Sequence, residues 1–134
     1  MLKYISTICL TITFLVVIFI LAPMLNFNYN YLLFKDELLY HHLLCPIICI
    51  ITFLFFDKLE KYTLKENIIT IFATLLYGIV IVILNILKIV DGPYPFIRIN
   101  YQPVAISIMW IVVLLTFSYI IALLFRKIHH KINK

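Results

Sequence analysis

Four long apolar runs, separated by short polar connections, dominate the pattern of hydrophobic and polar residues along this chain. The runs cover residues 5–25, 39–56, 68–87 and 104–125, and none of them contains an Asp, Glu, Lys or Arg. A helix needs about 18–20 apolar residues to cross the hydrocarbon core of a bilayer, which is roughly 30 Å thick. The pattern therefore predicts an all-α, polytopic membrane protein with four transmembrane helices, forming a single membrane domain over residues 1–134.

The composition of the chain leads to the same class of protein. Hydrophobic residues make up 65% of the 134 residues, only 13% are charged, and the mean hydropathy is +1.12. A soluble domain is nearer about 25% charged, so a soluble core of this size could not bury so much apolar surface. The first run begins with a basic residue, as signal peptides do. Its length and the absence of a small-residue cleavage site in Ala22-Pro23-Met24 favour a retained helix.

The net charge of +5 comes from basic residues in the connections, and we interpret it as an orientation signal rather than a nucleic-acid-binding surface. Lys3, the 57–67 connection and the tail after Phe125 hold eight of the eleven Lys and Arg residues. Basic residues accumulate in the cytoplasmic loops of membrane proteins. We therefore expect a multi-pass protein of the cell membrane with cytoplasmic N- and C-termini, which contacts membrane lipids and no nucleic acid.

His41 and His42 are the ionisable residues that stand out within the second apolar run. Such residues at membrane depth are costly, and they are functional candidates by default. A neutral imidazole can act there as a general base, although histidines near a helix end can equally well bind interfacial water. Pro46 cannot bond to the carbonyl of His42, so the sequence predicts a kink at this point.

All three cysteines lie inside predicted spans, so we expect ordinary buried thiols rather than a disulfide framework. His41, Cys45 and Cys49 share one helical face but are spread over about 12 Å of helical rise, too far to converge on one metal ion. We predict no metal site and no cofactor. The second histidine pair, His129-His130, lies in the basic tail and is expected to face water or lipid headgroups.

The connection between the third and fourth runs holds the segment Pro93-Tyr94-Pro95, which predicts a stiff, extended path. Gly92 would allow the turn that leaves the third helix. This connection and the histidine pair lie on the same predicted side of the membrane, so the loop could fold over the histidines. The resulting hypothesis is one site with His42 or His41 as base and four substrate-binding residues: Asn85, Asp91, Tyr94 and Arg98.

Within this hypothetical site, Arg98 would contact a lipid phosphate or carboxylate. The alternative is a rigid interfacial loop that carries an aromatic anchor and binds nothing. In the third run, Gly78 is expected to permit the close approach of another helix, and Asn85 to form a hydrogen bond between helices.

Two motifs follow one another along the chain. The first is the run Tyr40-His41-His42-Leu43-Leu44-Cys45-Pro46, followed by Phe55-Phe56-Asp57-Lys58. The second is Leu76-Tyr77-Gly78, followed by Gly92-Pro93-Tyr94-Pro95-Phe96. The first resembles the histidine-to-proline helix of the androgen-induced-protein family of integral membrane proteins, and of its bacterial members most closely. The second resembles that family's Tyr-Pro-Phe signature between the last two helices. The resemblance implies a multi-helix fold of which this chain lacks the first helices. It also implies hydrolysis of lipid esters by an intramembrane Thr with a His partner.

On this resemblance His42, four residues before Pro46, would be the catalytic histidine, and His41 the alternative. The first run contains Thr7, Thr11 and Thr13, but none of them can be aligned with the family's nucleophilic Thr. The expected functions are therefore a lipid-ester hydrolase or acyltransferase, a non-enzymatic membrane subunit, or a small transporter-like or haem-binding protein. An active enzyme would need a homo-oligomer or other membrane subunits to complete its cavity.

Overall fold

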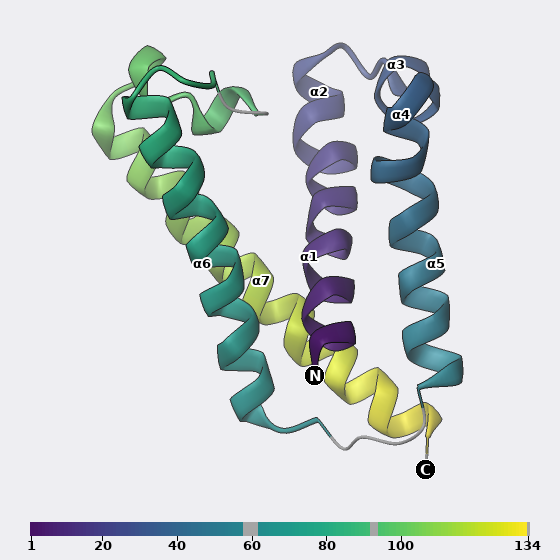
Figure 1. Cartoon of the computed structure of the whole chain (residues 1–134). Helices are drawn as coiled ribbons and strands as arrows, with labels where there is room; N and C mark the ends of the chain where they lie inside the picture. The colour runs from purple at the N-terminus through teal and green to yellow at the C-terminus, as the bar shows by residue number, and fades with distance from the viewer. Residues whose placement is uncertain (58–61, 92–93, 134) are drawn as a thin grey trace.

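The computed structural model describes residues 1–57, 62–91 and 94–133, and four of its helices are long and apolar enough to cross a membrane (Figure 1). These spans are Leu2–Met24, Asp36–Phe56, Leu64–Ile86 and Val104–Ile132. All regular structure in the described part of the chain is helical. The prediction of an all-α, multi-pass membrane fold is thereby confirmed.

The spans are built from α-helices with short π-helical turns inside them, and short helical turns fill the connections. In chain order the elements are α1 (Leu2–Val16), η1 (Val17–Leu21), α2 (Ala22–Met24), α3 (Tyr29–Phe34), α4 (Asp36–Leu39), η2 (Tyr40–Leu44), α5 (Cys45–Ile51), η3 (Thr52–Phe56), α6 (Leu64–Ile86), η4 (Pro95–Ile97), η5 (Ile99–Tyr101) and α7 (Val104–Ile132). Of these, η1, η2 and η3 are π-helical, and η4 and η5 are 3₁₀ turns.

Proline accounts for the π-helical turn in the middle of the histidine helix. Pro46 has no N–H to bond the carbonyl of His42. The N–H of Cys45 instead donates to the carbonyl of Tyr40, five residues back, and the helix widens over η2. The same pattern precedes Pro23, where η1 interrupts the first span. The distortion predicted around His42 is thus present as a π turn, a feature found frequently at functional sites.

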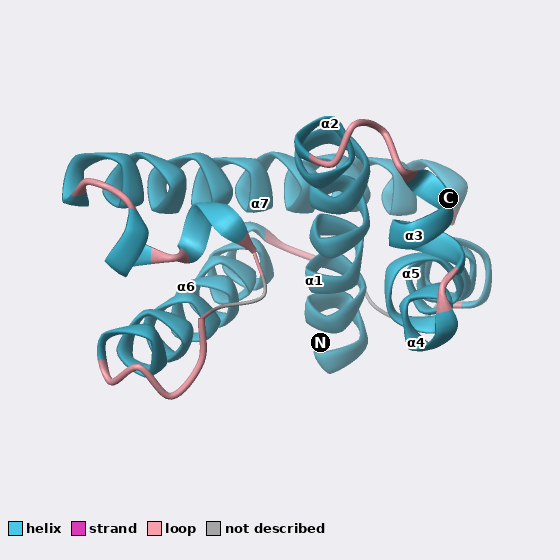
Figure 2. Ribbon diagram, turned by 90° about the horizontal axis from the view of Figure 1, so that it is seen from above, coloured by secondary structure: helices cyan, strands magenta, loops and turns pink. Residues whose placement is uncertain are grey.

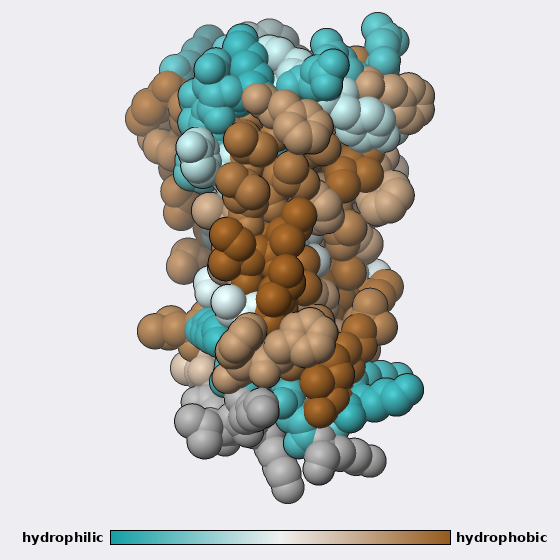
Figure 3. Space-filling model, turned by 90° about the vertical axis from the view of Figure 1, so that its right-hand side faces the viewer, coloured by the Kyte–Doolittle hydropathy of each residue, from teal (hydrophilic) through white to brown (hydrophobic). Residues whose placement is uncertain are grey.

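The first span stands at the centre of the molecule, with the second span on one side and α6 on the other (Figures 1 and 2). The last helix, α7, starts beside α6 and crosses behind the first span, so its C-terminal part lies near the end of the second span. In the first span, 44% of the most apolar stretch is buried inside the protein, whereas only 11% of the corresponding stretch is buried in the second and third spans. The outward faces of α5 and α6 are apolar and exposed. On the side that carries the second span, a hydrophobic band lies between two polar ends (Figure 3). That distribution suits helices whose outer faces contact lipid rather than water.

The last helix continues well past its predicted end at Phe125 and carries the basic tail as part of α7. The prediction that His129 faces water or headgroups is wrong, because only 2% of its surface is exposed. Its Nε2 donates a hydrogen bond to the carbonyl of Asp57, and its ring lies 4.8 Å from that of Phe53. Lys and Arg have high helix propensity, so the basic tail continues α7 to Ile132. The longer helix places His129 against Phe53 and Asp57.

Polar side chains tie all four spans together at the end of the bundle that carries both termini, which we call the terminal end (Figure 1). The Tyr4 hydroxyl lies 2.7 Å from both the Asn67 Oδ1 and the Ala122 carbonyl, so it joins the first span to α6 and α7. The Tyr62 hydroxyl donates to the Asp57 carboxylate at 2.9 Å. Lys3 Nζ lies 3.9 Å from the same carboxylate, at the end of the second span.

Candidate functional site

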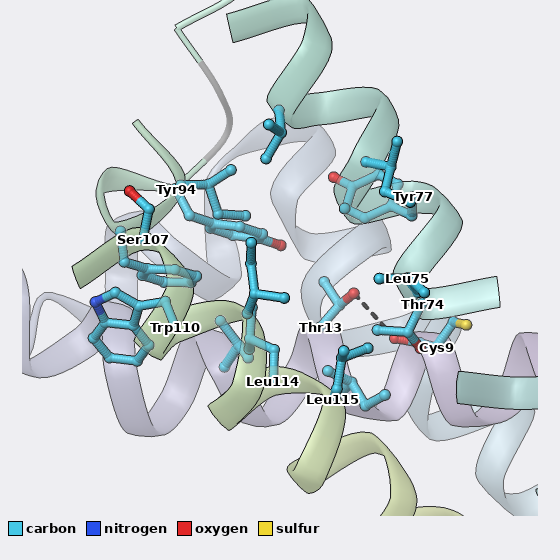
Figure 4. A pocket seen from close by; sticks show the side chains of 18 of the residues that line it. Cys9, Thr13, Thr74, Leu75, Tyr77, Tyr94, Ser107, Trp110, Leu114 and Leu115 are labelled. Carbon is cyan, nitrogen blue, oxygen red and sulfur yellow. Dashed lines mark hydrogen bonds between the residues drawn. The ribbon is translucent and has the colours of Figure 1, made fainter. Parts of the chain in front are cut away.

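A cavity of about 530 Å³ lies on the side of α1 that faces α6 and α7 (Figure 4). Its walls come from the second half of α1, the middle of α6 and the first half of α7, and a roof comes from the connection between α6 and α7. None of its lining residues is charged. They are Cys9, Leu10, Ile12, Thr13, Val16, Thr74, Leu75, Tyr77, Gly78, Ile79, Val82, Ile83, Tyr94, Phe96, Ile97, Ile99, Ser107, Trp110, Ile111, Leu114 and Leu115.

Stacked aromatic rings form the roof of this cavity, and we call the end of the bundle that holds them the roof end. The Tyr94 and Phe96 rings stack with centroids 5.3 Å apart, and Phe96 meets Trp110 of α7 at 4.8 Å. The side-chain amide of Gln102 fixes the segment by donating to the Phe96 carbonyl at 2.8 Å and to the Ser107 hydroxyl at 2.9 Å.

Backbone geometry explains how this connection reaches back over the cavity. The chain leaves α6 through Lys88, which has a left-handed φ of 56°. The turn predicted at Gly92 and the stiff path at Pro93 lie outside the described residues. Tyr94 is extended, as predicted, and Pro95 opens the 3₁₀ turn η4. The Tyr94 side chain therefore reaches into the space between the helices rather than outward (Figure 4).

Tyr94 is the most buried titratable group of the roof, and it remains a neutral phenol. Burial raises the pKa of its hydroxyl to about 12, the nearby Tyr77 adds to this effect, and the Thr13 hydroxyl partly opposes it. A phenol in this state can donate or accept a hydrogen bond but carries no charge. The cavity thus offers hydroxyl groups and apolar surface, with no charged group in its lining.

The predicted histidine site is not assembled in this chain. His42 Nδ1 lies 3.0 Å from the carbonyl of Leu32, on the side of the first span occupied by α5, and His41 is exposed. The first span separates both histidines from the roof segment, although all of them lie toward the same end of the bundle (Figures 1 and 2). The expectation that the Tyr94 loop folds over the histidines is therefore wrong, because the loop covers α6 and α7 instead.

Of the four predicted substrate-binding residues, only Tyr94 lines the cavity. Asp91 and Arg98 are exposed at the roof end. Asn85 is fully buried, and its backbone carbonyl accepts a hydrogen bond from Asn100 at 2.8 Å. Its side-chain amide has no hydrogen-bond partner among the described residues, so the predicted interhelical hydrogen bond from Asn85 does not form there.

The sequence analysis did not predict the cavity, because most of its lining residues are apolar and resemble any other residues that pack between helices. Gly78 was expected to allow close helix contact, but a Cβ built there has no atom within 4 Å, so it faces open space in the cavity wall. The one signal that could have located the cavity is the pair Tyr77-Gly78 at mid-span, facing hydroxyl residues of the first run. The three cysteines are free thiols, but the expectation that they are buried is wrong, because Cys45 is exposed and Cys9 and Cys49 are only partly buried.

Comparison of the chain with protein-family models, with curated proteins and with solved structures finds no match. The resemblance to the androgen-induced-protein family therefore stays a prediction from the residues that carry it.

Proposed function

We propose that this chain is a membrane protein that binds an apolar ligand, a lipid chain, in the cavity between α1, α6 and α7. The observation that carries the proposal is the cavity itself, about 530 Å³ in volume and lined by apolar and uncharged side chains. Small-molecule sites in proteins measure about 300–1,000 Å³ and are mostly apolar, with a few polar groups. This cavity has the size and the chemistry of such a site.

The depth of the cavity favours a lipid chain over a water-soluble ligand. Its lowest lining residues, Cys9 and Thr74, lie well inside their spans, so the floor of the cavity is at hydrocarbon depth. The Thr74 hydroxyl is satisfied within the protein, by the Thr70 carbonyl at 3.1 Å and by Ser118 at 3.1 Å. A hydrated ligand would lose its water there without gaining partners, whereas an alkyl chain loses nothing.

Trp110 provides a direct test, because it is the single tryptophan of the chain and lines the cavity. We expect a fatty acid brominated along its chain to quench Trp110 fluorescence when it is added at low mole fraction to nanodiscs of unbrominated lipid. Gly78→Phe should abolish most of this quenching, because the new ring fills the open space at Gly78. Gly78→Ala is the matched control and should retain it. Equal quenching in all three proteins would mean contact with bulk lipid, and would reject the proposal.

The orientation and the partners expected from the sequence belong to this proposal as well. Both termini lie at one end of the bundle, next to Lys3, Arg126 and Lys127, and the positive-inside tendency would place that end in the cytoplasm of the cell. Membrane lipids are then the partners, and a homo-oligomer would bury part of the exposed apolar faces of α5 and α6. A reporter enzyme that is active only in the cytoplasm, fused to the C-terminus, tests the orientation. An inactive fusion would indicate that the termini lie on the opposite side of the membrane.

Hydrolysis of a lipid ester is a second candidate, and one observation favours it. The Leu32 carbonyl can only accept, so His42 donates from Nδ1, and the lone pair of Nε2 is left available as a base. Binding is the better supported function because the cavity and His42 lie on opposite sides of the first span. Ester turnover by the purified protein that disappears in His42→Ala and persists in His41→Ala would establish hydrolysis. Equal background rates in all three proteins would exclude this role for His42.

A further inference from the structure

We propose that the Tyr77 hydroxyl is a hydrogen-bond donor that selects, among apolar molecules, those carrying an acceptor oxygen such as a ketone carbonyl within the chain. The inference rests on the proposed function and adds to it the chemical class of the ligand. It follows from how the polar groups of the spans are satisfied, from the position of Tyr77, and from its geometry relative to Tyr94.

The five threonine hydroxyls of the first and third spans are satisfied by their own helices. Thr7, Thr11 and Thr13 donate to carbonyls four residues earlier, at 2.7, 2.7 and 3.1 Å. Thr70 and Thr74 do the same in α6, at 2.9 and 3.1 Å. A short side chain can bend back to its own backbone in this way, but the hydroxyl of a tyrosine is held too far from its helix. The threonines of the cavity wall therefore have no need of a ligand, and a tyrosine there needs an outside partner.

Tyr77 is 52% exposed, whereas the buried tyrosines Tyr4 and Tyr62 have such partners. Tyr4 lies 2.7 Å from Asn67 Oδ1, and the Tyr62 hydroxyl donates to the Asp57 carboxylate at 2.9 Å. Tyr77 forms no hydrogen bond with any residue that the structure describes. Its ring lies in the cavity wall, and its oxygen points across the cavity toward that of Tyr94 (Figure 4).

Water is a poor partner for the Tyr77 hydroxyl at this position. Tyr77 lies nine residues before the end of α6 at Ile86, a separation of about 14 Å along the axis at 1.5 Å per residue. The other end of α6 is farther away still, so the hydroxyl lies at hydrocarbon depth. A polar group without a partner at this depth costs free energy, and an acceptor delivered by the ligand removes that cost.

The ligand must supply an acceptor rather than a donor. Thr13 donates to the Cys9 carbonyl at 3.1 Å, so its proton is not available to a ligand. The Tyr77 hydroxyl has no acceptor among the described residues, and its oxygen points into the cavity (Figure 4). A long-chain dialkyl ketone fits this arrangement, with its alkyl arms against the apolar walls and its carbonyl oxygen at Tyr77.

Displacement of the brominated fatty acid from the cavity tests the inference, with Trp110 fluorescence as the readout. The competitors are a long-chain dialkyl ketone and the alkane of the same length. We expect the ketone to bind the wild type about fivefold more tightly than the alkane, the usual worth of one hydrogen bond. Tyr77→Phe should remove this preference, so that ketone and alkane bind with equal affinity. Tyr94→Phe, which deletes the same atom from the opposite wall, should keep the preference.

Infrared spectroscopy of the bound ketone gives a second readout that needs no variant. Donation by Tyr77 lowers the carbonyl stretching frequency below its value in an alkane solvent, and an unshifted band would overturn the inference. So would equal affinities of wild type for ketone and alkane, or a ketone preference that survives in Tyr77→Phe. Loss of all competitor-sensitive quenching in wild type would instead reject the proposed function, so the two failures are distinguishable.

Discussion

The two ends of this bundle are held together in different ways. At the terminal end, side chains from three spans and from the connection before α6 meet in one cluster, where Tyr4, Phe53, Tyr62 and His129 are buried to 2% exposure or less. At the roof end, the polar contacts are local: Gln102 bonds to Phe96 and Ser107, and His42 bonds to Leu32. The cavity opens beneath this second, more loosely tied region.

The difference shows how a small membrane protein can combine a fixed fold with an adaptable site. Burial of apolar surface gives no hydrophobic driving force between helices in lipid, so close packing of side chains and hydrogen bonds stabilise the assembly of the helices. Here they are concentrated where Tyr4 stacks on Tyr62 at 4.6 Å and reaches both α6 and α7. The roof end can then leave space between helices without losing their arrangement.

The largest expected effect comes from removing the ring at the centre of the terminal cluster. Phe53 is fully buried and packs against Tyr4, Tyr62 and His129. Phe53→Ala should lower the free energy of unfolding by about 3–5 kcal/mol, the usual cost of such a cavity. Unfolding in mixed detergent micelles measures this value. Phe55→Ala, two residues along and more than half exposed, should change it little, and equal losses would deny the cluster its central role.

A smaller effect is expected from removing the hydroxyl that links three spans. Tyr4→Phe keeps the ring but leaves Asn67 Oδ1 without its partner, so we expect a loss of about 1–3 kcal/mol. The same unfolding assay applies. Tyr119→Phe is the matched control, because the Tyr119 hydroxyl has no hydrogen bond to the described residues. A Tyr4→Phe protein as stable as its control would show that the link does not stabilise the terminal end.

The start of α6 at the terminal end offers a third, more modest test. Thr63 and Glu66 form a capping box at the start of this helix. The side chain of each residue accepts a hydrogen bond from the backbone N–H of the other. Thr63→Ala should cost about 1 kcal/mol of stability. Hydrogen exchange of the first turn of α6 should rise at the same time, while exchange near Gly78 stays constant. Uniform acceleration along α6 would mean that the whole helix, and not its cap, responds.

The smallest effect has the opposite sign and belongs to the roof end. Gly78 lies in a helix interior and faces open space, so Ala can be accommodated without a clash. Gly78→Ala should raise the free energy of unfolding by roughly 0.5–1 kcal/mol through helix propensity alone. Destabilisation in the same unfolding assay would show that a neighbouring helix closes on Gly78, and that the cavity is not open there.

The helical fold follows from the sequence because four uncharged apolar runs leave few alternatives, and Pro46 predicted the distortion before it was seen as a π turn. The candidate site did not follow, because it depends on which helices are neighbours. Periodicity places Tyr94 and His42 toward one end of the bundle but says nothing of the first span standing between them. The burial of His129 was missed for the same reason, since its partner Asp57 lies 72 residues away.

The most direct test of the account is to map where a photoreactive lipid chain reacts with the protein in a bilayer. A diazirine-bearing alkyl chain, analysed by mass spectrometry, should label cavity residues such as Thr13, Thr74 and Leu114 in wild type. These labels should disappear in Gly78→Phe, while labels on the exposed outer face of α6, at Phe72, persist. Labelling of the outer faces alone, identical in wild type and Gly78→Phe, would contradict the account and leave the cavity without a ligand.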